Sequence, residues 1–266
     1  MLTRLILQQR LVSLLGPAGT GKTRLALQLA DAVKRWFPDG VWLVELAPLQ
    51  EAELLPSVIA TTLGIEEGPT ADPLTALTDG LGSRRLLLVL DNSEHLVEQV
   101  AFLVDRLLRA CAQLAILVTS RERLAVPGEM AWRVPPLETP LVGRRYTPAE
   151  LARVAAVLLF VDRARRVGAD LVVTSENASA VAEMVRSLDG LPLAIELAAA
   201  WTGTLSPAEL HARLADRFRL LTAQDRSMNP RHASLRVAID SSYEALGEVE
   251  RSLFRQLGLF AGGWTL

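Results

Sequence analysis

Residues 16–23 of the chain are GPAGTGKT, which matches the spacing of a phosphate-binding P-loop in full. Glycines let successive backbone N–H groups turn toward bound phosphates, and the start of the helix that follows adds a partial positive charge. Lys22 is expected to reach the β and γ phosphates, and the Thr23 hydroxyl is expected to ligate Mg²⁺. The predicted phosphate-binding residues are Gly16, Gly19, Thr20, Gly21, Lys22, Thr23 and Arg24.

The residues on both sides of this loop favour a phosphate site over an ordinary glycine turn. The apolar run LVSLL, residues 11–15, predicts a buried strand before the loop, and a helix is expected from Lys22 to Phe37. We expect this helix to bury one face, formed by Leu25, Leu29, Ala32 and Trp36. A strand before the glycines and a helix after them are the context that the motif requires.

Strands and helices are predicted to alternate along the first half of the chain. Further apolar runs predict strands at residues 41–46, 86–91, 114–120 and 132–134, and helices are expected at 50–63, 73–81 and 95–110. This alternation indicates a three-layer α/β domain with a parallel sheet, which we assign to residues 1–135.

The pattern changes after Pro135, and from there only helical periodicity is evident. Residues 136–147, which contain prolines and an arginine pair, are the expected linker, and an all-helical domain is expected over 148–228. Thr147 with Glu150, and Ser206 with Glu209, fit the capping box that starts a helix. Gly168 and Gly190 stand where helix ends favour a left-handed residue.

An acidic residue ends the third predicted strand, in the sequence LLLVLDNSEH at residues 86–95. The carboxyl ends of parallel strands form the edge where α/β sheets bind ligands, so Asp91 is predicted to share the Mg²⁺ ion with Thr23. The alternative is an ordinary turn built on Asp-Asn. Asn92 cannot accept a proton, so Glu94 is the nearby carboxylate that could act as a base.

Arginines follow the next predicted strand, in TSRERL at residues 119–124. A guanidinium at this sheet edge could detect a γ phosphate, so Arg121 is the candidate sensor, and Arg123 is interpreted as a solvated side chain. Arg163, Arg165 and Arg166 near a predicted helix end are also interpreted as a solvated face. The three histidines lack the spacing of metal ligands.

The composition excludes several classes of protein. The 266 residues are 50% apolar and 22% charged, which is globular usage, and the net charge of -2 gives no general attraction for nucleic acid. No apolar run is long enough for a membrane span, and no signal peptide is evident. The single cysteine suits a reducing compartment, so a cytoplasmic location is expected.

Several segments together resemble one family. GPAGTGKTRLALQLA, LLLVLDNSEHL, TSRERL, DGLPLAIELAAAW, RHASLRVAIDSSYEAL and LFAGGWTL occur in this order. They are similar to the NB-ARC-like nucleotide module of STAND ATPases, as found in bacterial transcriptional regulators of the large LuxR and antibiotic-regulatory kinds. The resemblance implies a P-loop domain, a helical domain and a winged helix, which would begin within residues 229–266 and be truncated.

The family also implies roles for single residues. Lys22 and Thr23 correspond to its Walker A contacts, Asp91 to its Walker B acid and Arg121 to its sensor arginine. Pro192, in the sequence GLPLA, corresponds to a proline of the helical domain near the adenine. The segment that family members carry before the first strand is not matched, so we expect a module shortened at both ends.

Two functions are consistent with these motifs. The first is a molecular switch that binds ATP or ADP with Mg²⁺, hydrolyses ATP slowly and associates with itself or with protein partners in the ATP state. The second is a protein-interaction scaffold that binds nucleotide without useful turnover. A small-molecule phosphotransferase lacks an evident acceptor site, and direct nucleic-acid binding by this chain is not expected from its charge.

Overall fold

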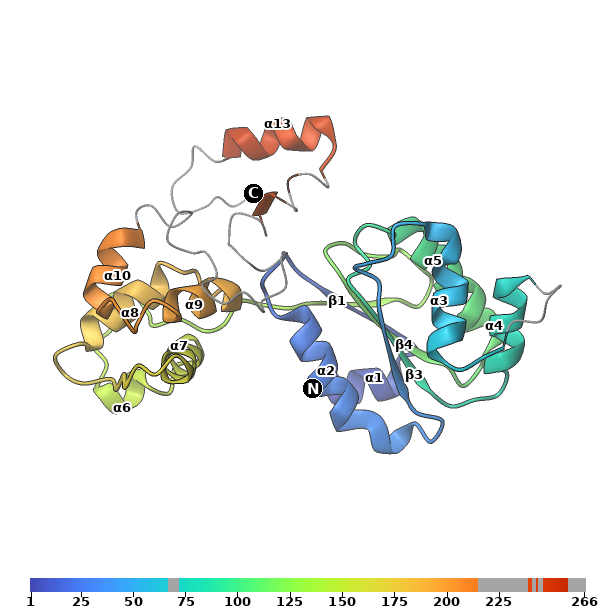
Figure 1. The fold of residues 1–266 in the computed structure, drawn as a ribbon, viewed down its shortest axis with the longest axis horizontal. Helices are drawn as coiled ribbons and strands as arrows, with labels where there is room; N and C mark the ends of the chain where they lie inside the picture. The colour runs from blue at the N-terminus through green and yellow to red at the C-terminus, as the bar shows by residue number, and fades with distance from the viewer. Residues whose placement is uncertain (67–71, 215–238, 241–242, 244–245, 258–266) are drawn as a thin grey trace. The chain divides into compact units, whose positions relative to one another are not determined.

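The computed structural model describes residues 1–66, 72–214, 239–240, 243 and 246–257 (Figure 1). By their internal contacts the residues form two compact units. The first contains Met1–Pro17 and Gly21–Pro135, and the second contains Ala18–Thr20 and Pro136–Leu266.

A five-stranded parallel sheet forms the centre of the first unit. Its strands are β1 (Leu11–Leu15), β2 (Val41–Glu45), β3 (Leu87–Asp91), β4 (Ala115–Ser120) and β5 (Met130–Arg133). They lie in the order β2-β3-β4-β1-β5, and every neighbouring pair is parallel. The predicted α/β class with a parallel sheet is therefore confirmed. The central position of β1 and β4 brings the P-loop and the end of β4 to the same edge of the sheet.

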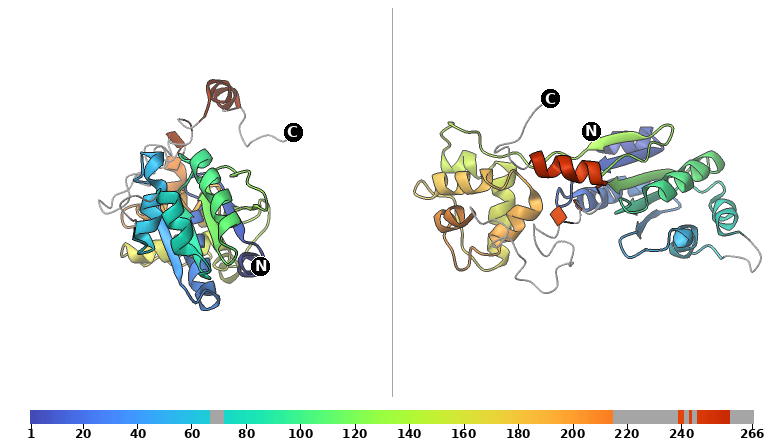
Figure 2. Two further views of the ribbon diagram at one scale, coloured as in Figure 1. Left: turned by 90° about the vertical axis from the view of Figure 1, so that its right-hand side faces the viewer. Right: turned by 90° about the horizontal axis from the view of Figure 1, so that it is seen from above.

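Helices cover both faces of the sheet, which makes the three layers (Figures 1 and 2). The elements are α1 (Leu2–Gln8), α2 (Lys22–Val33), η1 (Lys34–Trp36), η2 (Ala52–Leu54), α3 (Leu55–Thr62), α4 (Pro73–Leu81) and α5 (Val97–Ala110). Alternate residues of a strand point to opposite faces. Leu88 and Leu90 of β3 pack in one core with α3, α4 and α5, whereas Leu87 and Val89 pack in the other core with α1 and α2.

Two features of the first unit differ from the sequence-based expectations. Helix α1 precedes the first strand and buries Ile6, although no helix is expected there from the sequence. Helix α2 buries Ala26, Leu29, Ala30 and Val33, so of the four residues expected on its buried face only Leu29 is buried. Leucines stand on more than one side of α2, and small residues let it approach the sheet closely, so packing decided its orientation.

Cys111 lies at the end of α5, in the core beside the sheet, and its side chain is buried. Its Sγ is 3.8 Å from the carbonyl oxygen of Thr78. The Arg10 guanidinium donates hydrogen bonds to the carbonyl oxygens of Leu114 and Cys111, which ties the start of β1 to the turn before β4. Burial raises the pKa of the Cys111 thiol, and the charge of Arg10 lowers it by a smaller amount.

The described part of the second unit is helical. It contains α6 (Pro148–Leu151), α7 (Ala155–Arg166), α8 (Ala178–Arg186), α9 (Pro192–Ala199), α10 (Pro207–Arg213) and α13 (Glu248–Leu257). Both predicted capping boxes are present, and Gly168 and Gly190 have φ angles of 81° and 66°, as expected for left-handed residues. Residues 215–238 and most of the predicted winged-helix segment lie outside the described residues.

An apolar core joins helices α7, α8, α9 and α10. Phe160 of α7, Met184 of α8 and Ile195 of α9 are fully buried in it. The interpretation of Arg163 as a solvated side chain was wrong. Its Nε lies 2.8 Å from Glu196 Oε1, and only 14% of its side chain is exposed. The carboxylate partner comes from another helix, so the sequence around Arg163 alone could not reveal the ion pair. Among the described residues, no helix combines the length and apolar character needed to cross a membrane.

Candidate functional site

The P-loop connects the end of β1 at Leu15 to the start of α2 at Lys22. Gly19 and Gly21 have φ angles of 81° and 85°, a left-handed region that a residue with a Cβ atom rarely adopts. The Gly16 N–H donates to the Ser120 carbonyl oxygen at 3.3 Å, so the loop begins against the end of β4. The sequence thus forms the strand, turn and helix that the motif predicts.

Lys22 points back over the loop from the first turn of α2. Its Nζ donates hydrogen bonds to the carbonyl oxygens of Gly16 and Pro17, at 2.8 and 3.2 Å. Only 9% of the residue is exposed, and this burial lowers the pKa of the ammonium group. The charges of Glu94 and Asp91 raise this pKa, and that of Arg121 lowers it further. The two carbonyl oxygens therefore hold the end of the Lys22 side chain against the glycine loop.

The two predicted metal ligands contact each other directly. The Thr23 hydroxyl donates to the Asp91 carboxylate, with 2.8 Å to Oδ1 and 3.0 Å to Oδ2. Asp91 is the last residue of β3 and is only 7% exposed. Residues 68 positions apart in the chain are thus joined behind the P-loop.

Thr119 is a residue of this site that the sequence reasoning missed. Its hydroxyl donates to Asp91 Oδ1 at 2.5 Å and accepts the N–H of Asn92 at 2.9 Å. A signal was available, because the apolar run of β4 ends in two polar residues, Thr119 and Ser120, and both are buried. Polar side chains at the carboxyl end of a strand beside that of Asp91 could have been included on the same argument.

The predicted sensor and the predicted base form an ion pair. The Nε of Arg121, just after β4, lies 3.1 Å from Oε1 of Glu94. Only 19% of the arginine side chain and 12% of the glutamate side chain are exposed. The structure therefore brings these two residues together, whereas Arg123 pairs with Glu129 at 3.4 Å and is 60% exposed, as expected for a solvated side chain.

The remaining predicted site residues lie in two places. Thr20 is buried, with 6% exposure, and Arg24 is exposed on the first turn of α2. Pro192 is the first residue of α9, the position where proline suits a helix start. Its predicted place near an adenine stays a prediction.

The oxygen atoms of Thr23, on α2, and Asp91, at the end of β3, suit Mg²⁺. The ion accepts few protein ligands and keeps several waters and phosphate oxygens around it. One hydroxyl, from Thr23, and one carboxylate, from Asp91, meet this requirement. Among the described residues there is no cluster of three or more histidine, cysteine or acidic side chains that could hold a metal by itself.

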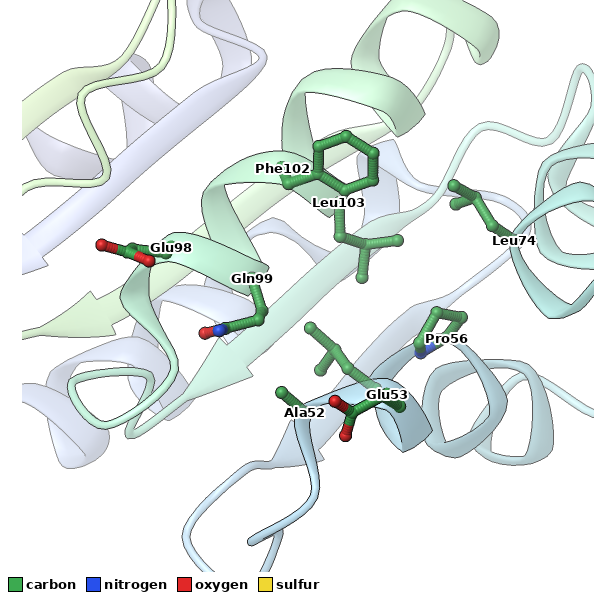
Figure 3. Close-up of a pocket in the computed structure, with 9 residues that line it drawn as sticks. Ala52, Glu53, Pro56, Leu74, Glu98, Gln99, Phe102 and Leu103 are labelled. Atoms are coloured by element: carbon green, nitrogen blue, oxygen red, sulfur yellow. The ribbon is translucent and has the colours of Figure 1, made fainter.

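A cavity of about 380 Å³ lies elsewhere in the first unit, between α3, α4 and α5 (Figure 3). Its wall is mostly apolar and includes Phe102, Leu103 and Leu74, and its two charged side chains are Glu53 and Glu98. The two carboxylates repel phosphate groups, and none of the residues that line the cavity carries a positive charge to offset this repulsion. This cavity is therefore not the phosphate site that the P-loop indicates.

The glycine loop joins a parallel strand to a helix that begins with Lys22, and the acid Asp91 ends β3, which is separated from β1 by β4. This arrangement defines the fold of a P-loop NTPase domain. Residues 6–125 match the family described as "AAA domain". This match covers the loop, Asp91 and the start of the segment after β4. The first unit thus has the α/β fold of a P-loop NTPase, and most of its residues are similar to this family.

Two relatives are regulatory proteins. The chain is 43% identical over 262 residues to the "Putative HTH-type transcriptional regulator" of Mycobacterium tuberculosis, covering 98% of this chain and 28% of that protein. It is 29% identical to "Regulatory protein AfsR" of Streptomyces griseus, covering 93% of this chain and 24% of that protein. The chain therefore spans about a quarter of the length of these curated relatives.

The fold is also similar to a chain in the structure of Drosophila ORC bound to DNA. The TM-score is 0.51 and the sequence identity 13%, with 83% of this chain and 65% of that chain covered. At this identity the similarity concerns the fold alone.

Proposed function

We propose that this chain is the nucleotide-dependent switch module of a signal-responsive transcriptional regulator, in which it binds ATP or ADP with Mg²⁺ and hydrolyses ATP slowly. The observation that carries the proposal is the contact between Thr23 and Asp91 behind a P-loop that holds Lys22. The names of the relatives, which are regulators, support the biological setting. The chain itself would act in the cytoplasm, without membrane or direct nucleic-acid contacts.

Each residue has a defined part in this function. Lys22 would leave the loop carbonyls to bind the β and γ phosphates, and Thr23 with Asp91 would hold Mg²⁺. Bound there, the ion would neutralise phosphate oxygens. Arg121 would contact the γ phosphate and so distinguish ATP from ADP, and Glu94, once released by Arg121, would accept a proton from the attacking water.

The test of binding compares Lys22→Ala with Lys34→Ala, which removes the same charge from an exposed site that pairs with Asp31. Lys22→Ala loses the charge-assisted bonds to phosphate, so its affinity for ATP should be about 10- to 100-fold lower than that of the wild-type protein. Lys34→Ala should leave the affinity unchanged. Isothermal titration calorimetry with ATP and ADP measures both, and equal dissociation constants for Lys22→Ala and wild-type protein would contradict the proposed site.

One observation favours a second function, a nucleotide-binding scaffold without useful turnover. The residue after Asp91 is Asn92, and the candidate base Glu94 is paired with Arg121 rather than free to approach water. An assay of phosphate release decides between the two functions. Release above the background of an Asp91→Ala variant supports the switch with turnover, and release at that background supports the scaffold.

A further inference from the structure

Thr119 contacts three consecutive residues of the neighbouring strand end. Its hydroxyl donates to Asp91 and accepts from the Asn92 N–H, and its carbonyl oxygen accepts both the N–H and the hydroxyl of Ser93, at 3.0 and 3.1 Å. The residue is 1% exposed. A single side chain on β4 is thus bonded to the carboxylate and to the turn that carries it.

These contacts fix the direction of the Asp91 carboxylate. Oδ1 accepts from both Thr119, at 2.5 Å, and Thr23, at 2.8 Å. A carboxylate between two hydroxyl donors loses the rotation that it would have with one. Because Thr119 is bonded to Oδ1, Oδ2 is the oxygen with more capacity left for a cation.

Thr119 also stabilises the backbone that follows Asp91. Asn92 has a φ angle of 63°, in the left-handed region, which asparagine adopts more readily than other residues with a Cβ atom but at a higher cost than glycine. The Thr119 hydroxyl accepts the Asn92 N–H, which would otherwise lose a hydrogen bond in a partly buried place. The hydroxyl therefore offsets part of the cost of the turn that orients Asp91.

We propose that Thr119 is a positioning residue of the nucleotide site, which sets the affinity for Mg²⁺ by holding Asp91 toward Thr23. The proposal rests on the proposed nucleotide-binding function. It assigns to Thr119 an effect on the Mg²⁺ dependence of binding rather than on the grip of the P-loop, because Thr119 bonds to Asp91 and Asn92, whereas the loop contacts come from Lys22.

The experiment measures ADP affinity across a Mg²⁺ titration and in excess EDTA. Thr119→Val replaces the hydroxyl by a methyl group of similar size, and it should raise the Mg²⁺ concentration at half-maximal effect about tenfold, the consequence of leaving buried polar groups without their partner. Affinity in EDTA should change less than twofold. Thr119→Ser keeps the hydroxyl and should restore the Mg²⁺ dependence to within about threefold of wild type.

Ser93→Ala is the matched control. It removes a hydroxyl that is as deeply buried and that bonds to the Thr119 carbonyl oxygen but not to Asp91. It should lower thermal stability without moving the Mg²⁺ midpoint. If Thr119→Val does not fold, Thr119→Cys, with a weaker donor of similar size, should shift the midpoint in the same direction.

The possible outcomes distinguish failure of the nucleotide-binding function from failure of the role of Thr119. Wild-type protein that binds no nucleotide overturns the nucleotide function and this proposal together. Wild-type protein that needs Mg²⁺, with a folded Val or Cys variant that has the same midpoint, overturns the role of Thr119 alone. Equal weakening in Mg²⁺ and in EDTA, without rescue by Ser, would also overturn it, because that pattern indicates general disruption of the loop.

Discussion

The edge of the sheet in the first unit and the core of the second unit differ in whether they bury polar side chains. Buried polar side chains gather around the ends of β1, β3 and β4, among them Lys22, Asp91, Ser93, Thr119 and Ser120. In the described residues from 136 onward, no polar side chain is buried. Burial of a polar group is costly unless it is hydrogen-bonded. We therefore expect the buried polar residues at the sheet edge to serve nucleotide binding and the buried apolar residues of the second unit to serve stability. Substitutions at the sheet edge should then change mainly function, and substitutions in the apolar core should change mainly stability.

The largest effect is expected in the apolar core. Phe160→Ala removes a fully buried ring between α7 and its neighbours, and it should lower the free energy of unfolding by about 3–5 kcal/mol. Leu158→Ala on the same helix, where the side chain is 53% exposed, should cost less than about 0.5 kcal/mol. Urea unfolding followed by circular dichroism measures both. Similar losses in the two variants would show that Phe160 is not part of a packed core.

The next effect is expected on function rather than stability. Asp91→Asn keeps the shape of the side chain and can accept both hydroxyl bonds through its carbonyl oxygen, so the free energy of unfolding should change by less than about 1 kcal/mol. Removing the charge should lower nucleotide affinity in Mg²⁺ about 10- to 100-fold and leave affinity in EDTA nearly unchanged. If stability falls as much as for Phe160→Ala, the contrast between the two regions is wrong.

The smallest effect is expected at the rim of the site. Arg121→Ala should weaken ATP binding by about tenfold while changing ADP affinity little, because ADP lacks the γ phosphate. Glu94→Gln should lower phosphate release without changing ADP affinity. Arg123→Ala, at an exposed ion pair, is the control. Because Arg121 and Glu94 are in contact, the double variant should not show the sum of the single effects. Equal losses for ATP and ADP would contradict the sensor role of Arg121.

Patterns within one element predicted most of the fold. The apolar runs located every strand of the sheet, with β5 beginning at Met130 rather than at Trp132, and the capping boxes located the starts of α6 and α10. The buried face of α2 could not be predicted, since leucines occur around the helix and contact with the sheet selects among them. Helix α1 has no start signal, and its Met1 cap makes no side-chain hydrogen bond.

Single residues of the candidate site could be proposed from sequence motifs. The contacts between side chains that follow different strands could not. Lys22, Thr23 and Asp91 follow from spacing and from strand ends, and the structure places the last two in contact. The pairing of Arg121 with Glu94 and the bonds of Thr119 depend on β3 and β4 being neighbours in register. A sequence pattern indicates that two strands end at one edge, but it does not say which side chains will touch.

The buried Cys111 has a practical consequence. It is the only cysteine of the chain, and it lies in the core beside α5 with a thiol whose pKa is raised by burial. Alkylating reagents react with the exposed thiolate, so they can modify this residue only when that part of the first unit opens. The rate at which Cys111 is alkylated therefore measures how often this part of the P-loop domain opens. A bound nucleotide that stabilises the domain would lower this rate, and no label has to be introduced to detect it.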